Sequence, residues 1–301
     1  MKMEGEVKWG YPGSLEEAVS FFREGYIPHG GGTTLIRSGL GAVYGLFTVS
    51  EVSEMRGFSV EKGRVVIGAG LTYSEIVEGV SDCLLVKALS HAASNPLRNR
   101  ITIGGSINVF PYWSDAVGPL VALGASLRLV DKNGKSSVVG IEEYIRNREF
   151  HREYFIVSVE FDNNGKGRNF YHREVRTHFD YPFFTVSILT YPPNGEIRIV
   201  VTGVKGRYKR LSKVESFFSG IASEFWEGEK GYGWLVEKFK ENFAGLRERV
   251  ENDMDAEFVS RQGVSKEYQR HVAGVVIRRG VWKILLEAVN AGENYGGGVN
   301  R

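Results

Sequence analysis

The amino-acid sequence predicts an α+β fold in which a mixed N-terminal region is followed by a smaller region of sheet plus helices. Two hairpin patterns, in residues 126–140 and 183–204, indicate antiparallel strands. Residues 265–291 repeat apolar side chains at helical spacing and predict one long amphipathic helix. Between the hairpins, residues 162–169 are polar and glycine-rich, so they are the best candidate for a domain boundary.

The first elements are short. Ser14 and Glu17 have the spacing of a capping box, which predicts a helix that begins here and ends at Gly25. The runs at 44–50 and 63–70 are rich in β-forming residues and predict short strands.

Two more helices are expected next. Thr72 and Glu75 form a second capping-box pattern and begin a helix that continues to Val80. Residues 82–94 predict a third helix, with Asp82 as its N-cap.

A glycine-containing segment at 101–107 reads as a loop, and a helix is expected after it, from Ser114 or Asp115 to Leu123. In the first hairpin, Asn133-Gly134 is the residue pair typical of a type I′ turn.

The remaining elements complete the two regions. A strand is predicted at 154–161, and the strands at 183–191 and 196–204 flank a proline- and glycine-containing turn. The final helix contains Gly274 and Gly280, which weaken a helix but do not by themselves end it.

Composition excludes several classes of protein. The chain has 301 residues, 42% hydrophobic and 25% charged, with a net charge of +2, so nothing in its charge indicates nucleic-acid binding. The basic cluster at 205–213 is read as a solvated or partner-facing loop. No apolar run is long enough for a membrane span and no signal-peptide pattern is present, so a cytoplasmic location without membrane contact is expected.

Cysteine and histidine usage argues against metals in this chain. Cys83 is the only cysteine, so neither an internal disulfide nor an iron–sulfur cluster held by this chain alone is possible. His151, His172 and His178 lack ligand partners at metal-binding spacing. No metal site is therefore predicted.

Two glycine segments are the main candidates for a binding function. "PHGGGTTLI" spans residues 28–36 and "ITIGGSI" spans residues 101–107. Successive glycine amides can form an anion-binding concavity, and nearby threonine and serine hydroxyls can also donate to phosphate oxygens. From composition alone, a diphosphate-containing cofactor and simple tight turns both remain possible. "GAGLTY" at 68–73 lacks the third glycine of a dinucleotide fingerprint, and the capping box already explains it.

Three blocks of sequence, in order, resemble one family. Residues 30–35 resemble the "AGGTDL" loop of the FAD-binding medium subunit of molybdenum hydroxylases, the group that holds carbon monoxide dehydrogenase, xanthine dehydrogenase and aldehyde oxidoreductases. Residues 94–130 are similar to the family's long "RN-x-(A/G)-T-(I/L)-GGN … SPAADL-x-PPLLALGA" block. Residues 202–220 and 265–281 are similar to the C-terminal domain of these subunits.

The resemblance implies a domain organisation. It predicts a two-lobed FAD-binding domain of the molybdopterin dehydrogenase (PCMH) type in residues 1–163, with lobes at about 1–55 and about 56–163. The smaller C-terminal domain would occupy residues 168–290, and residues 291–301 are expected to form a disordered tail.

It also implies a site for non-covalent FAD. The backbone of the two glycine segments would hold the pyrophosphate, Asp115 would accept a hydrogen bond from a ribose hydroxyl, Ala92 and Ile156 would line the pocket, and Arg173 would contact the cofactor. The glycine-segment residues are Gly30, Gly31, Gly32, Thr33, Thr34 and Leu35 in the first and Thr102, Ile103, Gly104, Gly105 and Ser106 in the second.

Alternative roles remain for several of these residues. Asp115 can be a helix cap, and Arg173 can belong to a surface ion pair. A histidine tether to the flavin is not expected, because the attachment position after the glycines is Thr33.

Several residues depart from the family pattern. Thr34 replaces an aspartate, Ser106 an asparagine and Arg173 a lysine, while Gly30 replaces an alanine. The segment at 109–113, "VFPYW", is bulkier than its counterparts.

The implied function is that of a flavoprotein subunit. The chain would pass electrons from [2Fe-2S] clusters on a small partner subunit through FAD to a terminal acceptor, while a large partner subunit carries the molybdopterin cofactor; such heterotrimers can assemble as dimers. No catalytic side chain is required in this chain, because the flavin does the redox chemistry. The alternatives are a UDP-N-acetylenolpyruvylglucosamine reductase-like flavoenzyme and a scaffold subunit that has lost FAD. Substrate and terminal acceptor are not encoded here.

Overall fold

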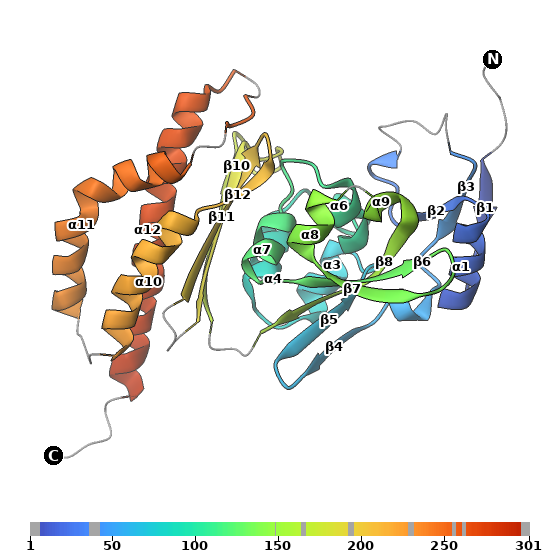
Figure 1. Ribbon diagram of the computed structural model, residues 1–301, viewed down its shortest axis with the longest axis horizontal. Helices are drawn as coiled ribbons and strands as arrows, with labels where there is room; N and C mark the ends of the chain where they lie inside the picture. Colours follow the sequence, from blue (N-terminus) through green and yellow to red (C-terminus); the bar gives the residue numbers. More distant parts are fainter. Residues whose placement is uncertain are drawn as a thin grey trace. The chain divides into compact units, whose positions relative to one another are not determined.

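The computed structural model describes residues 7–35, 43–147, 149–163, 167–191, 196–227, 232–254, 257–260 and 263–295. Its mixture of helices and sheets confirms the predicted α+β class (Figure 1). The chain divides into two compact units, the first from residues 7–111 and 123–163 and the second from residues 112–122 and from 167 onward.

The first unit begins with a small parallel sheet. Its strand order is β1-β3-β2, and helix α1 follows β1 in sequence. The Ser14 hydroxyl accepts from the Glu17 amide as predicted, but the Glu17 carboxylate accepts from the Gly13 amide, so the box is only half formed. The elements are β1 (Lys8–Gly10), α1 (Leu15–Arg23), β2 (Tyr26–His29) and β3 (Gly45–Thr48).

A five-stranded antiparallel sheet forms the rest of the first unit. Its order is β4-β5-β8-β6-β7, and Phe155 of β8 packs against Phe22 of α1 and Phe47 of β3, which joins the two sheets in one core. The strands are β4 (Phe58–Glu61), β5 (Arg64–Gly68), β6 (Ser126–Asp131), β7 (Ser136–Gly140) and β8 (Tyr154–Asp162).

Short helices connect these strands. The capping box of Thr72 and Glu75 is complete, with both reciprocal hydrogen bonds, so this predicted helix start is confirmed. A 3-10 turn, η1, spans Ser53–Met55. The helices are α3 (Tyr73–Gly79), α4 (Leu84–His91), α5 (Asn95–Arg98), α6 (Ile103–Val109), α8 (Ile141–Arg146) and α9 (Phe150–Glu153).

Two local predictions in this unit are wrong. Helix α4 has Cys83, not Asp82, as its N-cap residue. The β6–β7 turn is not type I′, because Gly134 but not Asn133 has a positive φ. Instead, Asp131 Oδ1 accepts from the amides of Asn133 and Lys135, and this side-chain contact selects a different turn.

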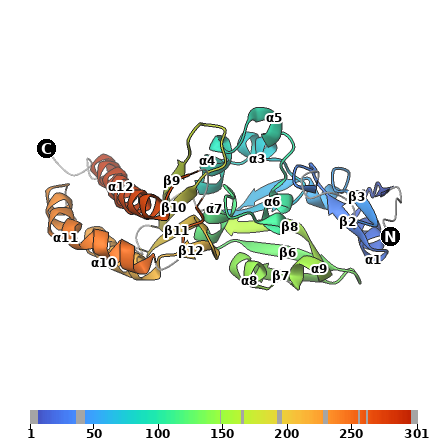
Figure 2. The same ribbon diagram turned by 90° about the horizontal axis from the view of Figure 1, so that it is seen from above.

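The second unit is a four-stranded antiparallel sheet with helices on both faces. Helices α10 and α12 pack against one face and α7 against the other (Figures 1 and 2). The strands, in the order β12-β11-β10-β9, are β9 (Arg168–Glu174), β10 (Phe184–Tyr191), β11 (Glu196–Val204) and β12 (Arg207–Arg210). The helices are α7 (Val117–Ala122), α10 (Ser212–Glu227), α11 (Tyr232–Asp253) and α12 (Lys266–Tyr295).

Close packing explains two details of the second unit. A Cβ on Gly118 would lie 2.9 Å from Ser187 Oγ, so α7 can lie directly on the sheet, and residues 112–122 belong to this unit although the predicted boundary placed them in the first domain. A Cβ on Gly280 would lie 2.5 Å from Phe170, so this glycine lets α12 approach the sheet without ending the helix.

Helix α12 continues to Tyr295, so the predicted tail boundary at residue 291 is too early. Residues 296–301 lie outside the described part of the chain. No helix within the described ranges has both the length and the apolar character needed to cross a bilayer.

Candidate functional site

The triple-glycine segment follows β2 and packs tightly against a second segment of the first unit. A Cβ on Gly31 would lie 1.5 Å from the carbonyl oxygen of Arg100, and one on Gly30 would lie 2.5 Å from Thr102 Oγ1. Gly32 has a φ of +70°, which favours glycine. The close approach that these glycines permit is therefore made by the protein's own residues around Thr102.

The amides of this segment are open. The N–H groups of Gly30, Gly31, Gly32 and Thr33 have no hydrogen-bond partner among the residues that the structure describes. These residues are half-buried, and buried backbone donors are normally paired. Four successive unpaired amides can bind an anion.

The second glycine segment was predicted to be a loop, but this prediction is wrong: the segment forms the first turn of α6. The amides of Ile103, Gly104 and Ser106 donate to main-chain carbonyls. The Gly105 amide donates at 3.2 Å to Oγ1 of Thr102, the N-cap residue. Of these amides, only that of Gly105 is held by a side chain that a ligand could replace.

The hydroxyls of Ser106 and Thr102 also differ in whether they are free to bind a ligand. Ser106 Oγ donates to the Thr102 carbonyl at 3.0 Å and accepts from the Tyr73 hydroxyl at 2.8 Å, so it is already engaged. The Thr102 hydroxyl accepts from Gly105, but its proton has no acceptor in the described part of the chain. Thr102 is therefore the better donor to a ligand.

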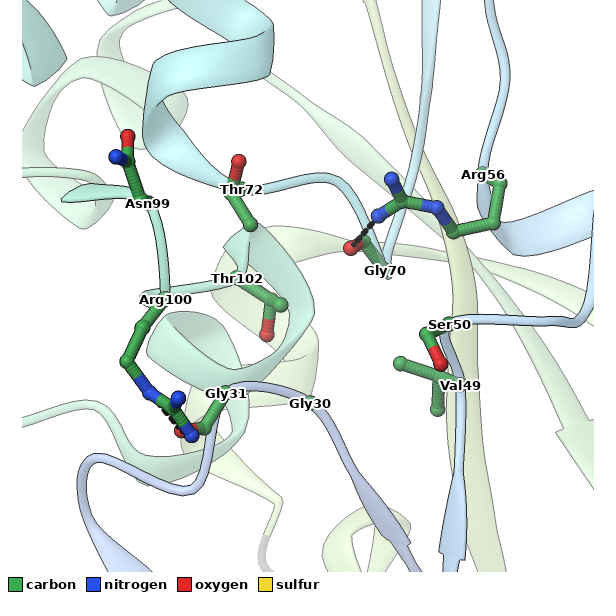
Figure 3. A pocket seen from close by; sticks show the side chains of 10 residues that line it. All are labelled: Gly30, Gly31, Val49, Ser50, Arg56, Gly70, Thr72, Asn99, Arg100 and Thr102. Atoms are coloured by element: carbon green, nitrogen blue, oxygen red, sulfur yellow. Dashed lines mark hydrogen bonds between the residues drawn. The ribbon is translucent and has the colours of Figure 1, made fainter. Parts of the chain in front are cut away.

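The glycine segment and the start of α6 meet at a cavity of about 210 Å³ (Figure 3). Complete small-molecule sites usually measure about 300–1,000 Å³, so this cavity has room for part of a dinucleotide. It is lined by Gly30, Gly31, Val49, Ser50, Arg56, Gly70, Thr72, Asn99, Arg100 and Thr102.

Two arginines line this cavity, and neither is among the residues predicted from the sequence. Arg100 donates from Nε and Nη2 to the Gly31 carbonyl, at 3.2 and 3.0 Å. Arg56 donates from Nη1 to the Gly70 carbonyl at 2.6 Å and forms an ion pair with Glu75. Arg100 was detectable as a cation two residues before Thr102, whereas no local pattern distinguishes Arg56.

Glu75 is held in its ionised form. Partial burial opposes ionisation, but hydrogen bonds from Thr72 and Arg56 outweigh it and lower the pKa of this carboxyl. One carboxylate thus caps α3 and fixes Arg56 at the cavity wall.

The other predicted residues of the first unit lie elsewhere. Ala92 and Ile156 are core residues that do not line this cavity. Thr34 is exposed, and Thr33 and Leu35 are half-buried beside the open amides.

In the second unit, Asp115 and Arg173 bind each other. Asp115 Oδ1 accepts from Arg173 Nε at 2.8 Å and from the Tyr171 hydroxyl at 2.6 Å. Arg173 also donates to the carbonyls of His178 and Asp180, at 2.9 and 2.5 Å. The ion pair suggested for Arg173 exists, but its side chain is only 8% exposed, so it is not a surface pair.

Tyr171 completes this cluster as a neutral donor. Burial, and then the negative charge of Asp115, raise the pKa of the phenol well above its ordinary value. The polar groups of Asp115, Tyr171 and Arg173 therefore already have partners, either within the cluster or in the carbonyls of His178 and Asp180.

Thiol and metal chemistry find no support in the described residues. Cys83 is buried, and burial raises the pKa of its thiol, so it is not a reactive thiolate. In the described ranges, no three histidine, cysteine, aspartate or glutamate side chains are grouped as a metal site requires.

Comparisons with known proteins show the family of the chain. Residues 5–161, more than half of the chain, match the model of the FAD binding domain in molybdopterin dehydrogenase. No curated protein matches the chain by sequence.

The fold matches chains of three solved oxidoreductases. With quinoline 2-oxidoreductase from Pseudomonas putida 86, the TM-score is 0.77 at 18% identity, over 95% of this chain and 99% of that one. With carbon monoxide dehydrogenase from Hydrogenophaga pseudoflava it is 0.79 at 19% identity, over 94% and 98%. With the reconstituted CO dehydrogenase from Oligotropha carboxidovorans it is 0.77 at 19% identity, over 93% and 98%. The predicted resemblance is confirmed: the chain belongs to the FAD-binding family of the molybdopterin dehydrogenases.

Proposed function

We propose that this chain is the FAD-binding subunit of a molybdenum hydroxylase-type oxidoreductase. One observation supports this most strongly: the four amides of residues 30–33 have no partner among described residues, and Gly30 and Gly31 line a cavity together with two arginines. Family membership supports FAD as the ligand, and its diphosphate is the anion that we expect these donors to receive.

The residues present fit this group. The amides of Gly30 to Thr33 would hold phosphate oxygens, and the Thr102 hydroxyl and the Gly105 amide would add donors from α6. The Gly31 carbonyl would not repel the phosphate, because it accepts two hydrogen bonds from Arg100. Bound FAD would supply the one- and two-electron redox chemistry that protein side chains lack.

The protein's own contribution is therefore binding and orientation. No general base or nucleophile among the cavity residues is needed. Asp115 and Arg173 hold the segments at 112–116 and 178–180 of the second unit in place, and a ribose contact from Asp115 remains part of the proposal.

The assembly and route of electrons extend the same proposal. The chain would receive electrons from [2Fe-2S] clusters on a small subunit and deliver them to a terminal acceptor, in a cytoplasmic complex whose large subunit holds the molybdenum cofactor. The matched structures support this, since two are CO dehydrogenases and the one from Hydrogenophaga pseudoflava lacks the Mo-pyranopterin moiety of its molybdenum cofactor.

Titration of the purified chain with FAD tests the proposal. We expect saturable binding by isothermal titration calorimetry and a bound flavin spectrum with maxima at about 370 and 450 nm. Absence of binding would favour a scaffold subunit that has lost FAD. NADPH oxidation that depends on UDP-N-acetylenolpyruvylglucosamine would favour the reductase alternative.

A further inference from the structure

Arg100 contacts the glycine segment in two ways. The Arg100 carbonyl oxygen occupies the space that a side chain on Gly31 would need. The Arg100 guanidinium donates hydrogen bonds from Nε and Nη2 to the carbonyl of Gly31. Nη1 makes no hydrogen bond to any residue in the described ranges. One edge of the guanidinium is therefore engaged, and Nη1 is available to a ligand in the cavity that Arg100 lines.

Arg56 enters the cavity from another element. It follows η1, and its side chain is 31% exposed, so it is accessible to a ligand. The Gly70 carbonyl and Glu75 hold Nη1 and Nη2, while Nε has no partner among described residues. Figure 3 shows Arg56 and Arg100 on opposite sides of the cavity, with the backbone of Gly30 and Gly31 and the Thr102 side chain between them.

We propose that Arg56 and Arg100 make this cavity selective for a diphosphate diester over a monophosphate. The inference rests on the proposed function and adds the residues that set its ligand specificity. A diphosphate diester carries a negative charge on each of two linked phosphorus centres, so one centre can accept from Nη1 of Arg100 while the other accepts from Nε of Arg56, whose Nη1 and Nη2 are already held. A monophosphate presents its charge at a single phosphorus centre, so it is less suited to contact two arginines that lie on opposite sides of the cavity. Hydrogen bonds between arginine and phosphate are stronger than those between neutral groups, which makes the second contact selective.

The test compares two nucleotides that lack the flavin. ADP-ribose contains a diphosphate diester and AMP a monophosphate, and both carry the same adenosine. Isothermal titration calorimetry of the full chain should show tighter binding of ADP-ribose than of AMP. The Arg100→Gln variant should weaken ADP-ribose binding by roughly ten- to a hundredfold, as the loss of charge-assisted hydrogen bonds predicts, and should change AMP binding much less.

Matched variants separate charge from position. Arg146→Gln removes an exposed arginine of the same unit whose partner, Glu142, is 3.9 Å away, and it should leave the ratio of the two affinities unchanged. Arg100→Lys keeps the charge but loses the pair of hydrogen bonds to the Gly31 carbonyl. Its ratio of ADP-ribose to AMP affinity should therefore lie between those of the wild type and Arg100→Gln. If Arg100→Gln does not fold, Arg56→Gln provides the same measurement.

The outcomes are distinguishable. If the arginine variants weaken the binding of ADP-ribose and AMP by the same factor, the ratio of the two affinities is unchanged. That result would show that the arginines only position the segment, and it would overturn the inference. If the wild type binds FAD but does not prefer ADP-ribose, the inference fails while the proposed function stands. If the wild type does not bind FAD, the proposed function itself fails.

Discussion

The cavity of the first unit and the Asp115 cluster of the second unit contrast in how their polar groups are used. In the segment that borders the cavity, the amides of residues 30–33 have no partner in the described structure, and neither has the hydroxyl proton of Thr102. In the cluster, Arg173 donates to three acceptors and Tyr171 to one, and the Asp115–Arg173 pair is largely shielded from solvent. Both regions contained predicted cofactor-binding residues, but only the cavity offers open donors.

The difference teaches how to separate ligand-binding groups from structural ones. A buried polar group is normally paired, so several open donors around one cavity indicate a missing partner. A buried charge that already has partners instead holds its segment in place. The following predictions test this distinction.

The largest effect is expected in the cluster of Asp115, Tyr171 and Arg173, called the closed cluster below because its polar groups already have partners. Asp115→Ala would leave Arg173 buried without its counter-ion and should lower the free energy of unfolding by about 3–5 kcal/mol. Denaturant unfolding measures this change. Lys283→Gln, in the same unit, removes an exposed pair with Glu287 and should cost less than about 1 kcal/mol. A similar small cost for Asp115→Ala would show that the cluster is not structurally important.

At the cavity, Gly31→Ala should reduce stability less but disrupt binding more. The added methyl collides with the Arg100 carbonyl, so the segment must move, at a cost of about 2–3 kcal/mol. A displaced segment no longer presents its amides, and each 1.4 kcal/mol lost from binding lowers affinity for FAD about tenfold. Calorimetry checks this prediction. Gly57→Ala is the control, because its Cβ would meet no atom within 4 Å, and equal FAD affinity in both variants would contradict the role of the segment.

Arg173→Lys makes a milder change in the closed cluster. Lysine keeps the charge but cannot reach Asp115 and the carbonyls of His178 and Asp180 in the geometry of the guanidinium. We expect a loss of roughly 1–2 kcal/mol in the free energy of unfolding, with FAD affinity changed less than by Gly31→Ala. A larger effect on FAD than on stability would instead support a direct cofactor contact.

The smallest effect is a pH dependence of the stability of the chain, and it arises at His29, next to the glycine segment. Burial, and then the positive charge of Arg100, lower the pKa of His29. The unfolded chain therefore takes up this proton first, and stability should fall as pH drops from about 6.5 through the lowered pKa. Thermal unfolding between about pH 7 and pH 5 should show a shallower slope for His29→Gln than for the wild type. Identical slopes would exclude His29 as the titrating group.

Tyr171 provides the opposite case in the closed cluster. Its raised pKa keeps the phenol protonated throughout that range, so the cluster should not contribute to the slope. A Tyr171→Phe variant with an altered slope between about pH 7 and pH 5 would contradict this.

The amino-acid sequence by itself determined where several of the helices and strands form, because periodicity and caps are local. The capping box at Thr72 and the two hairpins were predictable for this reason. Local patterns were not sufficient where a side chain or a distant segment supplies the hydrogen-bond acceptor. This is the case at the Asp131 turn and in α6, whose amides donate to the carbonyls of Leu71 and Ala69.

Tertiary structure alone decided which candidate residues remain open to a ligand. The motif around Gly31 was visible in the sequence, but its pairing with Arg100, across 69 positions, was not. Nor could a linear pattern show that Ser106 is engaged by Tyr73 or that Asp115 is neutralised by Arg173. Hydrogen bonding is decided by distances between segments that the fold brings together, and only those distances distinguish a free donor from a satisfied one.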